Sequence, residues 1–268
     1  MNLSRRVGRI LLVLGGLLVA GTAVVVTQPL WAFDALAWAM PRIVWRIETS
    51  EPLVALSFDD GPSPEHTPQV LEILSRHRAH ATFFLIGDHA VAHPDLVGRL
   101  RSEGHEVGSH YFTTRSTLRA SDDDFLANLM RTEEVLGLGG PIKLFRPPGG
   151  KIRPSQLRLA EDRGYRVILG SAYPYDGHHP PSAYIRWLVT KNLAPGVIII
   201  LHDGIADPSR MVAALDSILT AGAHKGLRFV TIGDLLRARK DRADVSGAAA
   251  CPPPAPPAGA APAAPGGG

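Results

Sequence analysis

From residue 52 to about residue 240, short apolar runs alternate with longer segments in which apolar residues recur at a helical period. The runs are too short for helices and rich in β-branched and aromatic residues, which predicts seven strands, at 53–58, 81–86, 106–109, 143–145, 166–169, 197–201 and 228–230. The periodic segments predict helices at 67–78, 94–102, 122–136, 154–162, 183–191, 209–221 and 231–239. A helix after every strand implies a parallel sheet.

Two further observations bear on whether that sheet is open or closed. The run 197–201 is apolar at every position, as expected for a parallel strand that is covered on both faces. No glycine-rich dinucleotide-binding fingerprint follows any predicted strand. We therefore predict one domain at residues 52–242, a closed or nearly closed barrel rather than an open doubly wound sheet.

The N-terminal residues 1–27 have the pattern of a membrane segment. Three arginines, at positions 5, 6 and 9, precede an uninterrupted apolar run at 10–26. Either an uncleaved anchor or a cleaved signal peptide has this pattern. Because the run lacks a clear cleavage site of small residues, we predict an anchor, with secretion after cleavage as the alternative. The arginines should stay on the cytoplasmic side, which places the domain outside the cytoplasm.

The segments on either side of the domain are simpler. Residues 28–51 are predicted to be a linker, although the aromatic residues in it also suit a helix near the membrane or a segment packed on the domain. Residues 243–268 are almost entirely Ala, Pro and Gly and should be a disordered tail. Cys251 in this tail is the single cysteine, so an intrachain disulfide is excluded. The net charge of +3 and the scattered basic residues argue against nucleic acid as a partner, and no obligate protein partner is indicated.

The candidate chemistry begins with two adjacent carboxylates, Asp59 and Asp60, at the end of the first strand. On their own they could form a solvated turn before Gly61. Polar residues also follow the later strands, namely His110, Arg146, Tyr173, Asp176, His202 and Asp203. In a parallel barrel the carboxyl ends of the strands meet on one face, where barrel enzymes carry out their reactions. The sequence therefore predicts an active site there.

Five segments in order along residues 52–232 make the chain resemble the polysaccharide deacetylase family, also called the NodB-homology family: Ser57-Phe58-Asp59-Asp60-Gly61-Pro62, Thr82-Phe83-Phe84, Gly108-Ser109-His110, Phe145-Arg146-Pro147-Pro148-Gly149-Gly150 and Ile200-Leu201-His202-Asp203. The resemblance implies a distorted (β/α)7 barrel. It also implies a hydrolase that removes acetyl groups from N-acetylated glycans with one divalent metal, usually zinc.

The resemblance also implies a role for each matching residue. The metal ligands would be Asp60, His110 and the residue at the position of a second histidine, which is Thr114. Asp59 would be the general base, oriented by Arg146, and His202 the general acid, with Asp176 in the catalytic group. Contacts to the substrate and its oxyanion would come from Gly149, Pro148, Tyr173, Ile200 and Leu201.

Two positions depart from the family pattern. Thr114 stands where a second metal-binding histidine is usual, and a threonine hydroxyl is a weak ligand for zinc. Tyr173 stands where the family has an aspartate that tunes the catalytic histidine, while Asp176 keeps the second aspartate of that motif. Either His178 or His179, which follow directly, could supply a missing ligand or base.

The function predicted from these residues is removal of acetyl groups from an envelope glycan, either peptidoglycan or a chitin-like polymer, by a membrane-anchored enzyme. A glycan-binding pseudoenzyme of the same fold is the first alternative, motivated by the two departures. A hydrolase of a different amide or ester is the second.

Overall fold

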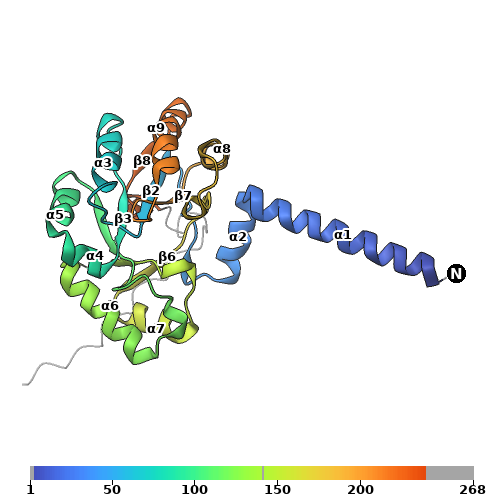
Figure 1. Ribbon diagram of the computed structural model, residues 1–268, viewed down its shortest axis with the longest axis horizontal. Helices are drawn as coiled ribbons and strands as arrows, with labels where there is room; N and C mark the ends of the chain where they lie inside the picture. The colour runs from blue at the N-terminus through green and yellow to red at the C-terminus, as the bar shows by residue number, and fades with distance from the viewer. Residues whose placement is uncertain (1–2, 141, 240–268) are drawn as a thin grey trace, which may run out of the picture.

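The computed structural model describes residues 3–140 and 142–239, and it consists of a long helix followed by a barrel of strands surrounded by helices (Figure 1). The predicted tail at 243–268, with Cys251, lies outside the described residues. The strands are β1 (Ile43–Val44), β2 (Leu53–Asp59), β3 (Thr82–Leu85), β4 (Glu106–Ser109), β5 (Lys143–Phe145), β6 (Tyr165–Ile168), β7 (Ile198–His202) and β8 (Arg228–Val230). The helices are α1 (Leu3–Thr27), α2 (Leu30–Ala39), α3 (Thr67–Arg76), α4 (Gly87–Ala92), α5 (Pro94–Ser102), α6 (Asp122–Leu136), α7 (Pro154–Asp162), α8 (Ser182–Asn192), α9 (Ser209–His224) and α10 (Ile232–Arg237).

All paired strands are parallel, in the order β1-β6-β5-β4-β3-β2-β7, and β8 pairs with the first half of β2. The two ends of this order are β1 and β7, and two isolated bridges join them: Arg46, after β1, pairs with Val197, and Ala172, after β6, pairs with Ile199 of β7. Single backbone contacts, rather than a full strand pair, therefore close the barrel at β7. The predicted distorted (β/α)7 barrel is confirmed.

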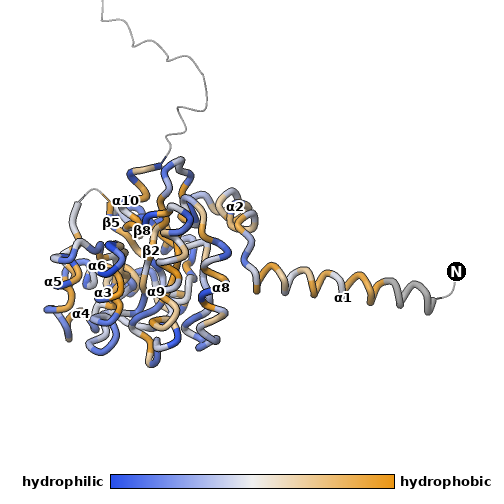
Figure 2. The backbone as a smooth tube through the Cα atoms, turned by 90° about the horizontal axis from the view of Figure 1, so that it is seen from above, coloured by the Kyte–Doolittle hydropathy of each residue, from blue (hydrophilic) through white to orange (hydrophobic). Residues whose placement is uncertain are grey.

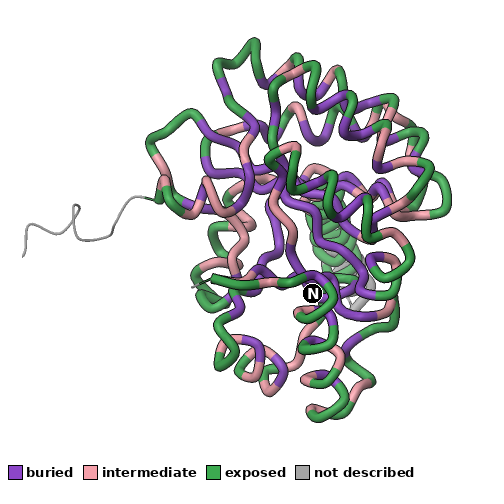
Figure 3. The backbone as a smooth tube through the Cα atoms, turned by 90° about the vertical axis from the view of Figure 1, so that its left-hand side faces the viewer, coloured by how far each residue is buried: buried purple, intermediate pink, exposed green. Residues whose placement is uncertain are grey.

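The core is arranged in two layers around the strands, which Figure 3 shows as buried segments inside a more exposed outer layer. All seven residues of β2 are buried. Successive side chains of a strand point to opposite faces, so Leu53 and Ala55 pack inside the barrel with Ile198. Val54 and Leu56 pack on the other face, in the cluster that also contains residues of α3 and α9. Burial on both faces is what the continuous apolar runs predicted.

Two elements were not predicted, and both are too short for a periodic pattern. Part of the predicted linker at 28–51 belongs to the barrel, because β1 pairs with β6 through Ile43 and Val167. A two-residue strand has no alternation to detect. The second element is the six-residue helix α4, which begins at Gly87. A Cβ atom at Gly87 would lie 2.4 Å from the ring of Phe112, so only glycine allows this close approach.

Helix α1 leaves the barrel as an isolated rod, apolar along most of its described length (Figures 1 and 2). Residues Ile10–Thr27 form an 18-residue window of mean hydropathy 2.5, and none of it is buried against the domain. By length and composition this helix can cross a membrane, although a signal sequence satisfies the same criteria.

Candidate active site

Strand β2 ends in two carboxylates that have different surroundings. Asp59 is the last residue of the strand and is 3% exposed. Asp60 has a φ of 70°, in the left-handed region where aspartate is tolerated better than most residues. Its side chain is 27% exposed. The structure therefore distinguishes the two carboxylates: one is enclosed in the protein, and the other is partly open to solvent.

Arg146 follows β5 and is almost completely buried. Its Nη1 atom lies 2.6 Å from Oδ1 of Asp59 and 2.8 Å from the hydroxyl of Ser57. Its other nitrogens donate to the backbone carbonyls of residues 168–169, at 3.3 and 3.2 Å, and the guanidinium lies 4.1 Å from the ring centroid of Phe84. Burial lowers the pKa of Arg146, and Asp59 opposes that shift. The result is a fixed ion pair in which one carboxylate oxygen of Asp59 is engaged.

Asp60 pairs with a second residue, His110, which follows β4. His110 is 3% exposed, and its Nε2 atom lies 3.4 Å from Oδ1 of Asp60. Burial raises the pKa of Asp60, but the hydrogen bond and charge of His110 outweigh burial and lower it. Asp60 is therefore a carboxylate at neutral pH. The other ring nitrogen of His110, Nδ1, is buried and has no hydrogen-bond partner among the described residues.

This pair suits a metal ion in part. Two ligands held about 2.0–2.1 Å from one tetrahedral zinc ion lie roughly 3.3 Å apart, close to the observed separation of 3.4 Å between Nε2 of His110 and Oδ1 of Asp60. Imidazole and carboxylate are usual ligands of catalytic zinc. Within residues 3–140 and 142–239, however, no group of three His, Cys, Asp or Glu side chains is placed to hold a metal. Two protein ligands are thus in position, and the remaining positions would be open.

His202, the last residue of β7, is held by Asp176. Oδ1 of Asp176 lies 3.0 Å from Nδ1 of His202, and Oδ2 accepts the backbone N–H of the same residue at 2.7 Å. Burial lowers the pKa of His202, but Asp176 outweighs it and, with Asp59 and Asp60, raises the pKa to about 9. In the family pattern the aspartate that tunes the histidine stands at position 173, which is a tyrosine here. Asp176, from the second position of that motif, makes this contact.

Tyr173 nevertheless belongs to the group. Its ring centroid lies 5.7 Å from that of His202. Burial, assisted by Asp176 and Asp59, raises the pKa of the Tyr173 phenol to about 12. The hydroxyl is therefore protonated at neutral pH and can donate a hydrogen bond.

The predicted substrate contacts are only partly brought together. Gly149 is exposed, with a φ of 65°, in a short turn at Pro148–Gly150 that directly follows Arg146 and its neighbour. Ile200 is half-buried and lies two residues before His202, on the same face of β7. Leu201 points to the opposite face and is fully buried in the cluster between the sheet and the helices. The structure therefore does not bring Leu201 to the site.

The candidates for a third ligand also lie apart from the pair. Thr114 is exposed in the loop after β4, and the described residues include no hydrogen bond from it to Asp60 or His110. His178 and His179 are exposed as well. Their proposed roles remain predictions.

Sequence reasoning assigned no role to Asp203, although it follows His202 directly. Asp203 is fully buried; its Oδ2 accepts the hydroxyl of Thr67, and its Oδ1 has no partner among the described residues. Burial raises the pKa of Asp203 to about 7, in spite of the hydrogen bond from Thr67. Its position at the end of a strand was the one sign in the sequence that Asp203 could belong to the site. Only the fold shows the burial that raises the pKa of this carboxyl group.

Gly204 lies against the backbone that carries Asp60. A Cβ atom at this position would be 2.0 Å from the carbonyl oxygen of Asp60. We expect Gly204→Ala to displace the end of β2 and to destabilise the protein by about 1–3 kcal/mol, the usual cost of overpacking. Urea unfolding would measure the loss. Gly177→Ala is the matched control, because nothing lies within 4 Å of a Cβ there; equal stability of the two variants would contradict the prediction.

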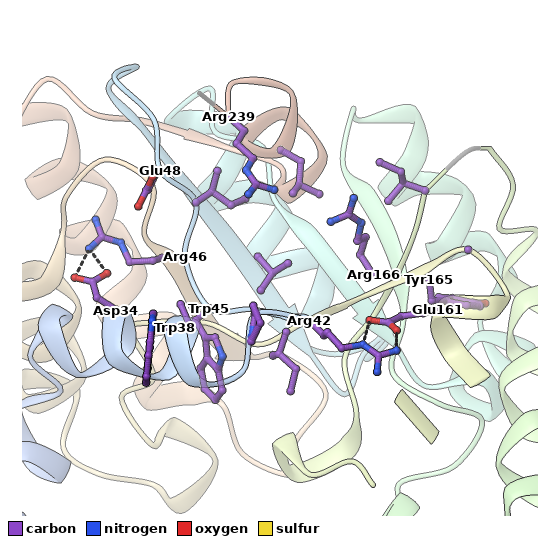
Figure 4. Close-up of a pocket in the computed structure, with 18 residues that line it drawn as sticks. Asp34, Trp38, Arg42, Trp45, Arg46, Glu48, Glu161, Tyr165, Arg166 and Arg239 are labelled. Carbon is purple, nitrogen blue, oxygen red and sulfur yellow. Dashed lines mark hydrogen bonds and ion pairs between the residues drawn. The ribbon is translucent and has the colours of Figure 1, made fainter. Parts of the chain in front are cut away.

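A cavity of about 670 Å³ lies elsewhere, among α2, β1 and residues 142–166 (Figure 4). Its walls carry two ion pairs, Arg46 with Asp34 and Arg42 with Glu161. None of the candidate active-site residues lines it. The candidate chemistry is therefore located at the strand ends rather than in this cavity.

Three comparisons with known proteins point to the same family. The profile of the polysaccharide deacetylase family matches residues 46–168. A peptidoglycan-N-acetylglucosamine deacetylase of Bacillus cereus is 38% identical over 199 residues, which cover 73% of this chain and 93% of that protein. A crystal structure of a peptidoglycan N-acetylglucosamine deacetylase superposes with a TM-score of 0.71 at 31% identity, over 77% of this chain and 98% of the other.

A second similar structure, a pseudoenzyme of carbohydrate esterase family 4 from Bacillus anthracis, has a TM-score of 0.67 at 24% identity, over 74% of this chain and 70% of the other; at this identity the likeness concerns the fold alone. The barrel fold and the similarity to named deacetylases place the protein among hydrolases of the carbohydrate esterase type. The chain belongs to the polysaccharide deacetylase family. The predicted family and enzyme class, a polysaccharide N-deacetylase, are confirmed.

Proposed function

We propose that this protein removes acetyl groups from an N-acetylated glycan of the cell envelope, such as peptidoglycan or a chitin-like polymer. The observation that carries the proposal is the meeting of three pairs at one end of the barrel: Asp59 with Arg146, Asp60 with His110, and Asp176 with His202. Each pair would supply one requirement of amide hydrolysis. The first would provide a general base, the second a site for a metal ion, and the third a general acid. The similarity to the peptidoglycan deacetylase of Bacillus cereus supports this class of substrate.

Asp60 and His110 would hold a divalent metal, for which zinc is the best match by ligand type. A bound divalent cation supplies a positive centre that polarises the amide carbonyl and lowers the pKa of water. His110 is buried, and the lowered pKa of Asp60 makes this side chain a carboxylate at neutral pH.

Asp59 would take the proton of the attacking water. Arg146 engages only Oδ1 of Asp59, and within the described residues Oδ2 accepts no hydrogen bond. Oδ2 is therefore the atom that can accept the proton. The ion pair with Arg146 orients this carboxylate.

His202 would donate a proton to the nitrogen of the leaving amine. Because its pKa is about 9, the imidazole carries this proton throughout the neutral range. The backbone N–H of Gly149 would stabilise the oxyanion, and Ile200 would contact the acetyl methyl group. Tyr173, close to His202, would donate a hydrogen bond to the substrate or to the imidazole.

The experiment that tests the proposed function measures acetate release from N-acetylglucosamine oligomers and from peptidoglycan, with a chelator and with added Zn²⁺. We expect release that depends on the metal. Absence of release from every substrate and with every metal would refute the proposal. It would favour the second candidate, a glycan-binding pseudoenzyme, which is supported by the absence of a third His, Cys, Asp or Glu ligand among the described residues.

Metal binding itself gives a separate prediction. We expect Asp60→Ala and His110→Ala each to lower Zn²⁺ affinity by at least 10-fold, because each removes one of two protein ligands. Thr114→His is expected to raise it by supplying a third ligand, and an unchanged affinity would show that position 114 does not reach the metal. Isothermal titration of the purified protein measures all three. An unchanged affinity in Asp60→Ala would show that this carboxylate is not a ligand. The matched control is His224→Ala, which removes an exposed histidine at the end of α9.

For its location, we propose that α1 stays in the membrane as an anchor and that the barrel lies outside the cytoplasm. The length and hydropathy of Ile10–Thr27 support a membrane span. The arginines before it support a cytoplasmic N-terminus.

A further inference from the structure

The end of α1 is docked on the part of the barrel that carries the site. The last carbonyl groups of a helix lack partners within the helix, and here the barrel supplies them. The hydroxyls of Tyr175 and Tyr184 lie 3.4 and 3.1 Å from the carbonyl oxygens of Val25 and Val26. The ammonium group of Lys191 lies 2.7 Å from the carbonyl oxygen of the next residue, Thr27. These contacts make α1 a fixed extension of the domain.

Gln28 strengthens the junction at residues 173–179, which form the catalytic loop after β6. It is 6% exposed, and its side-chain amide bonds both backbone groups of Tyr173: Oε1 accepts the N–H at 2.8 Å, and Nε2 donates to the carbonyl. Tyr173 in turn lies beside His202. The chain leaving the membrane helix is therefore in direct contact with the loop that surrounds the general acid.

The contacts limit the height of the site above a membrane. The ring of Tyr175 lies 4.8 Å from that of Tyr173, which lies 5.7 Å from the imidazole of His202. If Ile10–Thr27 spans the hydrocarbon core, its end lies at the start of the head-group layer. His202 is then within roughly 17 Å of that level, between two and three times the depth of one head-group layer.

Three exposed tryptophans lie near the same end of the molecule. Trp31 and Trp38 are seven residues apart on α2, a helix with no buried residue, and are 64% and 87% exposed. Trp187 on α8 is 44% exposed, next to Tyr184 and Lys191, which both bond the end of α1. We call these three residues the tryptophan belt; Figure 4 shows Trp38 on α2. Tryptophan and tyrosine are enriched where a membrane meets water.

We infer that the tryptophan belt rests on the lipid bilayer and holds the site at its surface, and that the substrate is an N-acetylated saccharide linked to a membrane lipid. This inference rests on the proposed function for its chemistry. A lipid bilayer is the occupant of the belt because the belt continues directly from the membrane span: Trp31 follows Thr27 by four residues. A saccharide on a lipid presents its sugar within reach of a site at this height, whereas distant wall polymer does not.

The position of the site is tested without any substrate. The full chain, in a Cys251→Ser background, carries a fluorophore on one introduced cysteine. In one variant this is His178→Cys, on the catalytic loop. In the other it is Ser102→Cys at the end of α5, on the side of the barrel away from α1 (Figure 1). The protein is inserted in phosphatidylcholine–phosphatidylglycerol vesicles with an acceptor dye on the head groups. We expect energy transfer to be several-fold more efficient from position 178. Equal transfer from both positions would overturn the surface position.

The substrate class is tested by two rates in the same vesicles, on an N-acetylglucosamine saccharide linked to a membrane lipid and on the soluble oligomer of the same sugar. We expect the ratio of the first rate to the second to be at least 10-fold, and to fall several-fold in a triple variant, Trp31→Ala with Trp38→Ala and Trp187→Ala. The control Met130→Ala removes an exposed apolar residue from α6 and should leave the ratio unchanged. A ratio near one in the wild type would exclude the lipid-linked substrate. Absence of acetate from both sugars would instead refute the proposed function, while energy transfer would still decide the position of the site.

Discussion

Asp59→Asn is expected to reduce acetate release about 10²–10⁴-fold, the usual contribution of a general base. Asparagine keeps the size of the side chain and an oxygen for Arg146, but its amide has no carboxylate oxygen with which to accept the proton of water. Zn²⁺ affinity should change little, because the candidate ligands are Asp60 and His110. A variant with the wild-type rate would show that Asp59 is not the base.

The same substitution should also destabilise the fold. Arg146 is 2% exposed, and its Nη1 atom lies 2.6 Å from Asp59. Removal of one partner from a buried ion pair leaves the other charge uncompensated, at a cost of about 3–5 kcal/mol. Activity must therefore be measured well below the unfolding transition, which circular dichroism locates. Asp95→Asn, an exposed substitution of the same kind on α5, should change neither rate nor stability.

Asp176→Asn is expected to move the alkaline limit of activity. With Asp176 present the pKa of His202 is about 9, so the imidazole keeps the proton of a general acid up to that pH. Without the carboxylate, burial and the remaining charges act on a pKa that is ordinarily about 6.5. The alkaline limb of the rate–pH profile should therefore fall by about two pH units. The rate at the optimum should fall as well, because the imidazole loses the partner that fixes its orientation.

Stability should respond to pH in the same variant. A histidine whose pKa is higher in the folded than in the unfolded state stabilises the fold fully below the unfolded value. For His202 this contribution is present below pH 6.5 and is lost as pH rises from 6.5 through 9. Thermal unfolding across that range should show the loss in the wild type and a smaller one in Asp176→Asn. A rate–pH profile and a stability profile that both match the wild type would show that Asp176 does not set the pKa of His202. Asp123→Asn, exposed at the start of α6, is the control.

The two departures from the family pattern differ once the structure is considered. Tyr173 replaces a carboxylate, yet Asp176 lies 3.0 Å from Nδ1 of His202, so the imidazole still has an acidic partner. No comparable replacement is found at Thr114: within the described residues, no third His, Cys, Asp or Glu side chain is placed to complete a metal-holding group with Asp60 and His110. The metal site is thus the part of the proposed mechanism that most needs a direct binding measurement.

Much of the barrel follows from the sequence alone. The apolar runs and periodic segments predicted seven strands and the helices after them, and α5, α6 and α7 begin and end where the pattern placed them. Such patterns are informative because the solvent-facing and buried positions of a regular element repeat at fixed intervals. Because parallel strands bring their carboxyl ends to one face, the strand-end residues could also be predicted to share a site.

Which of those residues touch was decided only by the tertiary structure. Periodicity describes an element and says nothing of the distance between side chains more than 80 positions apart, such as Arg146 and Asp59. It did not reveal the short strand β1, the burial of Asp203, the opposite direction of Leu201, or the contact of Asp176 with His202. Nor did it show that the end of α1 is bonded to the catalytic loop, since that contact joins Gln28 to Tyr173 across 145 positions. These features depend on packing between distant segments, which no local pattern in the chain records.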